Sequence, residues 1–97
     1  MIPNGVYLVG VLLQGTKLSG LCNIGYRPTI GGQHLVIEVH IFDFSEDIYG
    51  QAIEVKVIGA IRKEKKFKNL EELVGQIKRD KVKAMKMLSV FNKNSAG

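Results

Sequence analysis

The sequence predicts a small, mainly β domain that ends in one α-helix. Residues 5–58 are rich in β-branched and apolar residues, and glycine-containing turns interrupt them. Residues 70–88 repeat apolar residues at spacings of three and four, which is typical of an amphipathic helix. With 97 residues the chain has room for one domain, so we expect a single domain over residues 1–97.

Four strands are expected in the first sixty residues. Residues 5–13 and 18–24 form a hairpin around a turn at residues 14–17. Residues 25–32 contain Pro28 and three glycines and are expected to be a loop. Residues 35–42 and 51–58 supply the last two strands. Because no helix separates these strands, we expect a small antiparallel, Greek-key-like barrel.

Alternation within the last two strands predicts their buried faces. Residues 51–58 should point Ile53, Val55 and Val57 inward. The strand at residues 35–42 should bury one wholly aliphatic face, formed by Leu35, Ile37, Val39 and Ile41. Its other face carries Glu38 and His40. Apolar neighbours partly desolvate a carboxylate, which suits acid–base chemistry; alternatively, this is an edge or solvent face on which both groups are hydrated.

The helix is expected to follow a basic loop at residues 62–68. Asn69 and Glu72 have the spacing of a capping box. The apolar stripe consists of Leu70, Leu73, Val74, Ile77, Ala84, Met85 and Leu88. Lys81 falls near the centre of this stripe, so either its stem lies on the core and its amine reaches water, or the helix loosens there. Residues 92–97 are polar and are expected to fray.

Charge is concentrated at the C-terminal end of the chain. Residues 1–61 carry a net charge of −2 and residues 62–97 a net charge of +7. A basic end is typical of proteins that bind polyanions, but it also occurs as a solvated face that keeps a protein soluble. The aromatic residues are scattered over strands and loops and form no stacking platform, which argues against nucleic acid as a partner.

Several classes of protein are disfavoured. The single cysteine, Cys22, excludes an internal disulfide framework and a cysteine-based zinc site, and it fits a reducing, cytoplasmic setting. No apolar run approaches the roughly 18 residues that span a bilayer, and we expect no secretory signal. The acidic residues 43–47 lack the calcium-loop pattern, and no phosphate-binding glycine loop is found, so no metal ligand is assigned.

Six short blocks follow one another along the chain: Gly5-Val6-Tyr7, then residues 23–29 (NIGYRPT), 37–44 (IEVHIFDF), 47–51 (DIYGQ), 61–67 (IRKEKKF) and 70–80. In this order and at these spacings, they resemble the riboflavin kinase domain of the bacterial bifunctional riboflavin kinase/FAD synthetase. Each block alone is a weak signal. The ordered set is specific, and it extends over nearly the whole chain.

The resemblance implies a closed β-barrel with a helix packed on it. It also implies an activity, which is transfer of the γ-phosphoryl group of ATP to the ribityl 5′-hydroxyl of riboflavin. The product is FMN, and the reaction uses Mg²⁺. The glutamate that acts as the catalytic base in the family corresponds to Glu38. Such a base accepts the hydroxyl proton, while positioning and the metal supply most of the acceleration.

The resemblance also implies positions for the two substrates. The segment that contains Asn23 and Arg27 corresponds to one beside the active site, and the loop that contains Arg62 and Phe67 corresponds to a flap over the flavin. On the nucleotide side, Ile48 and Tyr49 correspond to an aliphatic and an aromatic residue that can sandwich adenine. Phe67 has an alternative role, as a hydrophobic staple for the helix that follows it.

One family motif is missing from this sequence. The family carries Pro-Thr-Ala-Asn upstream of the Gly5 block, and the Thr and Asn serve Mg²⁺ and the ATP phosphates. We therefore expect a fragment of the bifunctional enzyme or a degenerate relative, with the first strand or strands missing and little kinase activity alone. An open barrel edge favours pairing into a homodimer. The alternative function is a non-catalytic barrel that binds flavin, nucleotide or RNA.

Overall fold

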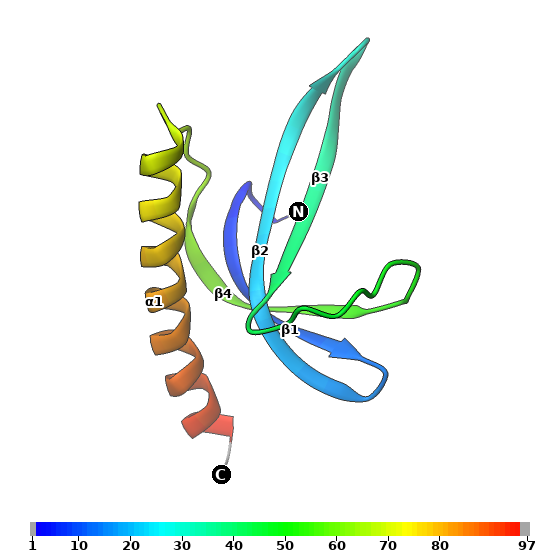
Figure 1. Ribbon diagram of the computed structural model, residues 1–97, viewed down its shortest axis with the longest axis vertical. Helices are drawn as coiled ribbons and strands as arrows, with labels where there is room; N and C mark the ends of the chain where they lie inside the picture. Colours follow the sequence, from blue (N-terminus) through cyan, green and yellow to red (C-terminus); the bar gives the residue numbers. More distant parts are fainter. Residues whose placement is uncertain (1, 96–97) are drawn as a thin grey trace.

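A computed structural model describes residues 2–95 of the chain, which form four strands and one helix (Figure 1). The strands are β1 (Gly5–Leu13), β2 (Thr16–Thr29), β3 (Gly32–Ile41) and β4 (Glu54–Lys63), and the helix is α1 (Leu70–Ser95). The predicted mainly β fold with a C-terminal helix is confirmed. The fourth strand begins and ends later than the predicted 51–58, so that Arg62 lies in a strand rather than in a loop.

The strands form one antiparallel sheet in the order β3-β2-β1-β4. Three consecutive strands are joined by hairpins, and β4 returns through residues 42–53 to pair with β1. This is the strand order of a Greek key, as expected. The sheet is open and is not the closed barrel that the resemblance implies, because β3 and β4 do not pair with each other and remain its two edges.

Two tight turns shape the hairpins. Gln14 and Gly15 have φ of 48° and 81° and connect β1 to β2, since Leu13 pairs with Thr16. The second turn, at residues 30–31, connects β2 to β3, since Thr29 pairs with Gly32. The prediction of a loop at residues 25–32 was therefore wrong for residues 25–29, which continue β2. Pro28 is compatible with this strand because β1 pairs with β2 only as far as Ile24, which leaves Pro28 in a two-stranded part of the sheet.

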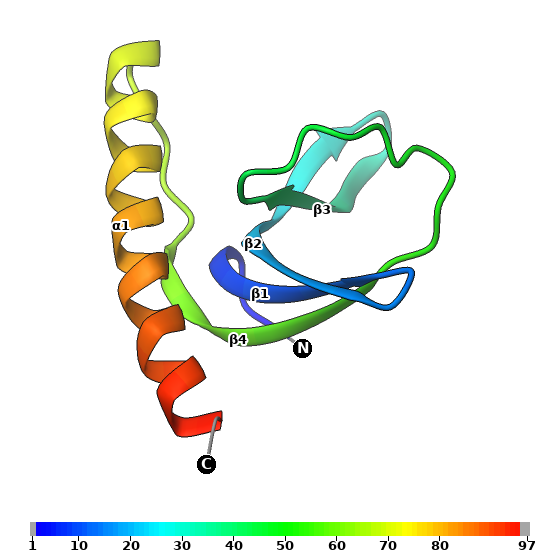
Figure 2. The same cartoon turned by 60° about the horizontal axis from the view of Figure 1, so that its bottom comes forward.

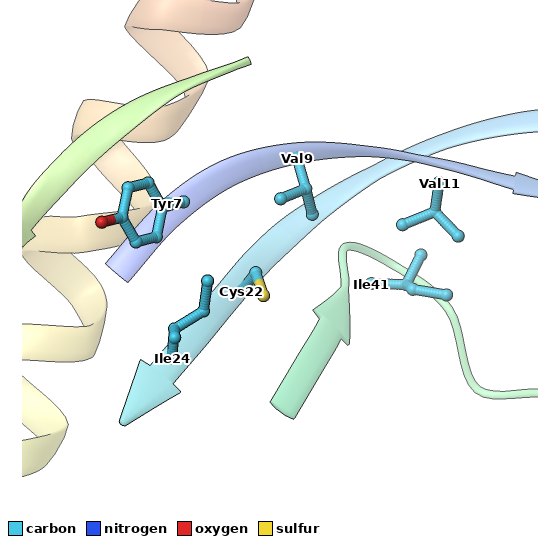
Figure 3. Close-up of a cluster of buried hydrophobic side chains, with 6 residues drawn as sticks. All are labelled: Tyr7, Val9, Val11, Cys22, Ile24 and Ile41. Atoms are coloured by element: carbon cyan, nitrogen blue, oxygen red, sulfur yellow. The ribbon is translucent and has the colours of Figure 1, made fainter. Parts of the chain in front are cut away.

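The two faces of the sheet carry separate apolar clusters. One cluster consists of Tyr7, Val9, Val11, Cys22, Ile24 and Ile41, whose side chains converge between β1, β2 and β3 (Figure 3). Phe44, Ile48 and Ile53, from the connection between β3 and β4, pack against it. The second cluster consists of Val6, Leu8, Leu21, Ile61 and Ala84, so it joins the sheet to α1. Figure 2 shows that this connection and α1 lie on opposite sides of the strands.

The expected core faces of β3 and β4 are only partly buried. Ile41 is buried, but Leu35 and Ile37 are 47% and 58% exposed. Leu35 lies where the β2–β3 hairpin projects beyond β1, because its partner Tyr26 comes after Ile24, the last β2 residue that pairs with β1. Ile37 lies opposite Ile24 at the end of β1, on edge strand β3. Val55 and Val57 are also exposed, because β4 is an edge strand. The prediction that these four side chains are core residues was wrong.

Helix α1 begins with a variant of the predicted capping box, in which Glu72 reaches back to the backbone N–H of Lys68 and not to that of Asn69. The backbone N–H of Glu72 donates to Asn69 Oδ1 (2.9 Å), and the Glu72 carboxylate accepts from the backbone N–H of Lys68 (3.2 Å). The helix continues beyond the predicted end at residue 88 to Ser95, so residues 92–95 are helical and the prediction that they fray was wrong. Residues 96 and 97, for which fraying was also expected, lie outside the described residues. None of the described residues forms a helix long and apolar enough to cross a membrane.

The buried face of α1 is rotated from the predicted stripe. Asp80 and Ala84 are buried and Met87 and Leu88 are partly buried, whereas Leu70, Val74, Ile77 and Met85 are exposed. The helix therefore presents a narrow strip to the sheet, and one charged residue lies within it. Lys81 reaches outward, with Nζ 4.0 Å from an Asp43 carboxylate oxygen and 5.9 Å from the centre of the Phe42 ring.

Candidate functional site

A cavity of about 640 Å³ opens between the sheet and the N-terminal half of α1. Side chains from β1, β2, β3, β4, the segment after β4 and α1 line it. Five of the seven predicted site residues are among them: Asn23, Arg27, Glu38, Arg62 and Phe67. The structure thus brings together residues that lie up to 44 positions apart in the sequence.

Strand register explains why these residues meet. Glu38 on β3 pairs with Asn23 on β2, Asn23 pairs with Val6 on β1, and Val6 pairs with Arg62 on β4. Directly paired residues of an antiparallel sheet point to the same face. The four side chains therefore form one row across all four strands, with the buried Val6 as an apolar floor between two polar ends.

Asn23 carries an unsatisfied polar atom at the centre of this row. Its Oδ1 is buried, and it accepts no hydrogen bond from the described residues. A buried carbonyl oxygen without a donor is unfavourable by about 1–3 kcal/mol. A ligand donor in the cavity would satisfy this oxygen, so Asn23 is suited to bind a ligand N–H or O–H group.

Glu38 is exposed, which corrects the expectation of a partly desolvated carboxylate. The reason is that β3 is an edge strand, so solvent reaches Glu38 from the open side of the sheet. The alternative interpretation, a hydrated edge position, is the one that the structure supports. Glu38 nevertheless lines the cavity opposite Asn23, so a proton acceptor is available at its rim.

Arg62 is held in the cavity wall by a carboxylate on α1. Its Nε lies 2.9 and 3.0 Å from the two oxygens of Asp80, whose residue is 3% exposed. Gln76 Nε2 also donates to Asp80 Oδ1 (2.9 Å). On the other side, the Arg62 guanidinium carbon lies 5.6 Å from the centre of the Phe67 ring, within the range of a cation–π contact.

A second ion pair lies at the cavity rim. Arg27 Nη1 is 2.9 Å from Glu64 Oε1, which joins the end of β2 to the segment after β4. Both side chains are more than one third exposed, so the pair contributes little to folding stability. The pair instead holds two segments together, because it connects the β2–β3 hairpin to the loop that precedes α1.

Sequence reasoning missed three of these residues: Glu64, Gln76 and Asp80. Glu64 and Gln76 carry no signal that distinguishes them from other surface residues. Asp80 does carry one, because it lies three residues after Ile77 and four before Ala84, both members of the predicted stripe. A carboxylate on the buried face of a helix requires a positively charged partner on the element that packs against it. The basic segment at residues 62–68 could supply that partner.

Ile48 and Tyr49 lie away from the cavity, in the connection between β3 and β4. Ile48 packs on the cluster formed by Tyr7, Val9 and their neighbours. Tyr49 is 97% exposed, and its backbone N–H donates to Asp47 Oδ1 (2.9 Å). The structure therefore leaves the Tyr49 ring available in the solvent, but it places both residues apart from the other five.

Neither Cys22 nor a metal cluster belongs to this site. Cys22 is buried in the cluster on the opposite face, where burial raises the pKa of its thiol. A thiol in that state is a poor nucleophile and a packing residue. Within residues 2–95, no three His, Cys, Asp or Glu side chains lie together in a way that could hold a metal ion.

The sequence is similar to several known proteins. It is 40% identical over 94 residues to a bifunctional riboflavin kinase/FMN adenylyltransferase of Bacillus subtilis, covering 94% of this chain and 30% of that protein. It is 48% identical over 77 residues to the protein of that name in Haemophilus influenzae, covering 78% and 25%. An RNA-binding riboflavin kinase of Bacillus subtilis is 42% identical over 80 residues, covering 81% and 35%. The chain thus spans about a quarter to a third of these relatives.

A solved structure shares the fold. It is titled as a macrolide-efflux protein from Streptococcus pneumoniae, and it matches with a TM-score of 0.78 and 38% identity over 84% of this chain and 27% of that one. The family model for riboflavin kinase, or flavokinase, matches residues 1–88, which contain all four strands, the cavity and most of α1. The chain therefore belongs to the riboflavin kinase family.

Proposed function

We propose that this chain is a riboflavin kinase domain, which phosphorylates riboflavin with ATP to give FMN in the biosynthesis of FMN and FAD. The observation that carries the proposal is the row of Glu38, Asn23, Val6 and Arg62 along one cavity, in a member of the riboflavin kinase family. Riboflavin has a planar, largely apolar ring and a polar ribityl chain, and this row offers both apolar and polar contacts.

Each residue of the cavity receives a role in this proposal. Phe67 and the Arg62 guanidinium contact the flavin ring, because both present flat surfaces at the cavity wall. Asn23 accepts a hydrogen bond from the flavin through its unsatisfied Oδ1. Arg27 lies at the rim and, with Glu64, limits the opening.

Glu38 acts as the general base. Its carboxylate accepts the proton of the ribityl 5′-hydroxyl while that oxygen bonds to the γ-phosphorus of ATP and the bond to ADP breaks. The products are FMN and ADP, and the proton is on Glu38. An exposed carboxylate is suited to this task because it can release the proton to solvent after each turnover.

The nucleotide is proposed to bind at Ile48 and Tyr49. The exposed Tyr49 ring is available to stack on adenine, and Ile48 lies next to it in the chain. Mg²⁺ accompanies ATP in reactions of this class. The described residues do not fit a metal site of their own, so no ligand and no step is assigned to the metal.

Two further properties are proposed. The buried, free Cys22 supports a reducing, cytoplasmic location. Association of two copies is supported by the exposed aliphatic side chains on edge strand β3, Leu35 and Ile37, since such an edge favours strand pairing.

Two measurements test the function. Riboflavin fluorescence should be quenched by micromolar protein, and MgADP should tighten the binding. Incubation with riboflavin and MgATP should then yield FMN at a low rate, detected by chromatography, and Glu38→Gln should remove that product. Quenching without any FMN would replace the kinase by a flavin-binding module. Absence of quenching at all accessible concentrations would refute flavin as the ligand.

A further inference from the structure

The side chain of Arg62 is held by Asp80, a residue of α1 that lines the cavity. Its Nε donates to both oxygens of Asp80, and its Nη1 donates to the backbone carbonyl of Lys63 (3.2 Å). Within residues 2–95, no hydrogen bond occupies Nη2. The guanidinium therefore keeps the N–H groups of Nη2 for a ligand, while the protein holds its Nε and Nη1.

Asp80 is itself oriented by the helix. Gln76, one turn earlier, donates from Nε2 to Asp80 Oδ1, and the Gln76 Oε1 accepts from Arg79 Nη2 (3.1 Å). The chain of contacts thus runs from Arg79 through Gln76 and Asp80 to Arg62. Because the Asp80 side chain is only 4% exposed, water does not compete for its oxygens, and the ion pair has a single geometry.

Docking of α1 does not depend on Asp80 alone. Ala84 is fully buried against the sheet, and Lys83 Nζ donates to the backbone carbonyl of Ile61. A buried carboxylate is therefore not needed merely to hold the helix in place, and an apolar residue would pack there with less desolvation. This points to a role for the charge at the cavity.

We infer that Asp80 is a positioning residue, which orients the guanidinium of Arg62 for the flavin through the Nε contact. The role rests on the proposed function, because the flavin is its ligand. Gln76 supports the same orientation from the helix. Asp80 also lines the cavity, but Arg62 and Gln76 already donate to its oxygens, so we expect its effect on flavin binding to pass through Arg62.

The first test measures the orientation without any ligand. In the NMR spectrum of the full chain, the Nε–H of Arg62 should exchange with solvent roughly tenfold more slowly than that of the exposed Arg79, because Asp80 binds it. Asp80→Asn should abolish this protection. Equal protection in the Asp80→Asn variant would overturn the inference, whether or not the chain binds flavin.

The second test asks whether Asp80 acts through Arg62. Asp80→Asn should weaken riboflavin binding by about tenfold in the wild-type chain but by less than about twofold in an Arg62→Met background. Equal weakening in both backgrounds would show that Asp80 acts independently and would overturn the inference. Glu71→Gln is the matched control, since it removes an exposed carboxylate from the same helix and should leave binding unchanged.

A third variant covers the case in which Asp80→Asn does not fold. Gln76→Met retains the Asp80–Arg62 pair and removes only its support from the helix, and it should speed the Arg62 Nε–H exchange and weaken riboflavin binding by about threefold. No change in either quantity would contradict the inference. If the wild-type chain binds no flavin, the proposed function fails, while the exchange measurement still decides whether Asp80 orients Arg62.

Discussion

Asn23 and Glu38 lie directly opposite each other on β2 and β3, so a buried, unsatisfied amide oxygen adjoins an exposed carboxylate on one face of the sheet. Cross-strand partners have Cβ atoms about 4.5–5.5 Å apart. One substrate can therefore donate a hydrogen bond to Asn23 and a proton to Glu38 at the same time. The pair separates binding, assigned to Asn23, from proton transfer, assigned to Glu38.

Replacement of Glu38 should therefore affect turnover and not binding. Glu38→Gln keeps the size of the side chain but removes the base, so kcat should fall by roughly 10²–10⁴-fold. Riboflavin affinity, measured by fluorescence quenching, should remain the same. Glu46→Gln provides the control, because Glu46 is an exposed carboxylate in the connection and does not line the cavity. A kcat that stays near the wild-type value would exclude Glu38 as the base.

Much of this arrangement could be predicted from the sequence. Composition and turn residues located the first two strands, alternation located the last two, and the Asn69–Glu72 spacing located the start of α1. The five cavity residues came from a family resemblance, and they meet because of strand register, which no local pattern reveals. The exposure of Leu35 and Ile37 was not predictable, since alternation shows which residues share a face but not whether another element covers it.

The buried face of α1 shows a second limit. The predicted stripe contained only apolar residues, so it excluded Asp80, whose burial depends on an ion pair with a residue 18 positions earlier. A helical period cannot identify a partner on another element. Conversely, Leu70 and Val74 satisfied the period and are exposed, because α1 packs on the sheet through a different strip, formed by Asp80, Ala84, Met87 and Leu88.

Tyr49 should be a residue for the nucleotide and not for the flavin. Tyr49→Ala should raise the KM for ATP by roughly tenfold, because stacking of a base on an aromatic ring contributes about 1–3 kcal/mol. Riboflavin binding without nucleotide should not change, since Tyr49 lies outside the cavity. Tyr49→Phe keeps the ring and should restore the wild-type KM. An unchanged KM in Tyr49→Ala would remove this residue from the nucleotide site.

The exposed aliphatic residues on β3 should promote self-association. Sedimentation velocity of the wild-type chain should show a concentration-dependent shift towards a dimer, and the double variant Leu35→Ser/Ile37→Ser should remain a monomer. Val90→Ser, at an exposed aliphatic position on α1, is the control and should still associate. A wild-type chain that stays monomeric at all concentrations tested would refute the dimer.

Gly20 should be required for close approach of β2 and β3. A Cβ atom at this position would lie 2.3 Å from the backbone carbonyl oxygen of His40, so either the strands separate or the pairing shifts. Gly20→Ala should lower the free energy of unfolding by about 1–3 kcal/mol. Gly10→Ala is the matched control, because its nearest contact would be at 3.7 Å, to the Ile58 side chain. Equal denaturation midpoints for the two variants would contradict the predicted clash.

Cys22 should make stability depend on pH in the alkaline range. Burial raises the pKa of the Cys22 thiol above its ordinary value of 9.0, so the unfolded chain ionises at a lower pH than the folded chain. Above pH 9.0 the unfolded state therefore binds fewer protons, and the free energy of unfolding falls by up to about 1.4 kcal/mol per pH unit until the folded thiol also ionises. Below pH 9.0 this contribution is fully retained. Urea denaturation at pH values on both sides of 9.0 measures it, and Cys22→Ala, which cannot ionise, shows the alkaline loss caused by all other groups. If both chains lose stability equally above pH 9.0, the thiol is not protected by burial, and it should then react with a disulfide reagent as quickly in the folded chain as in urea.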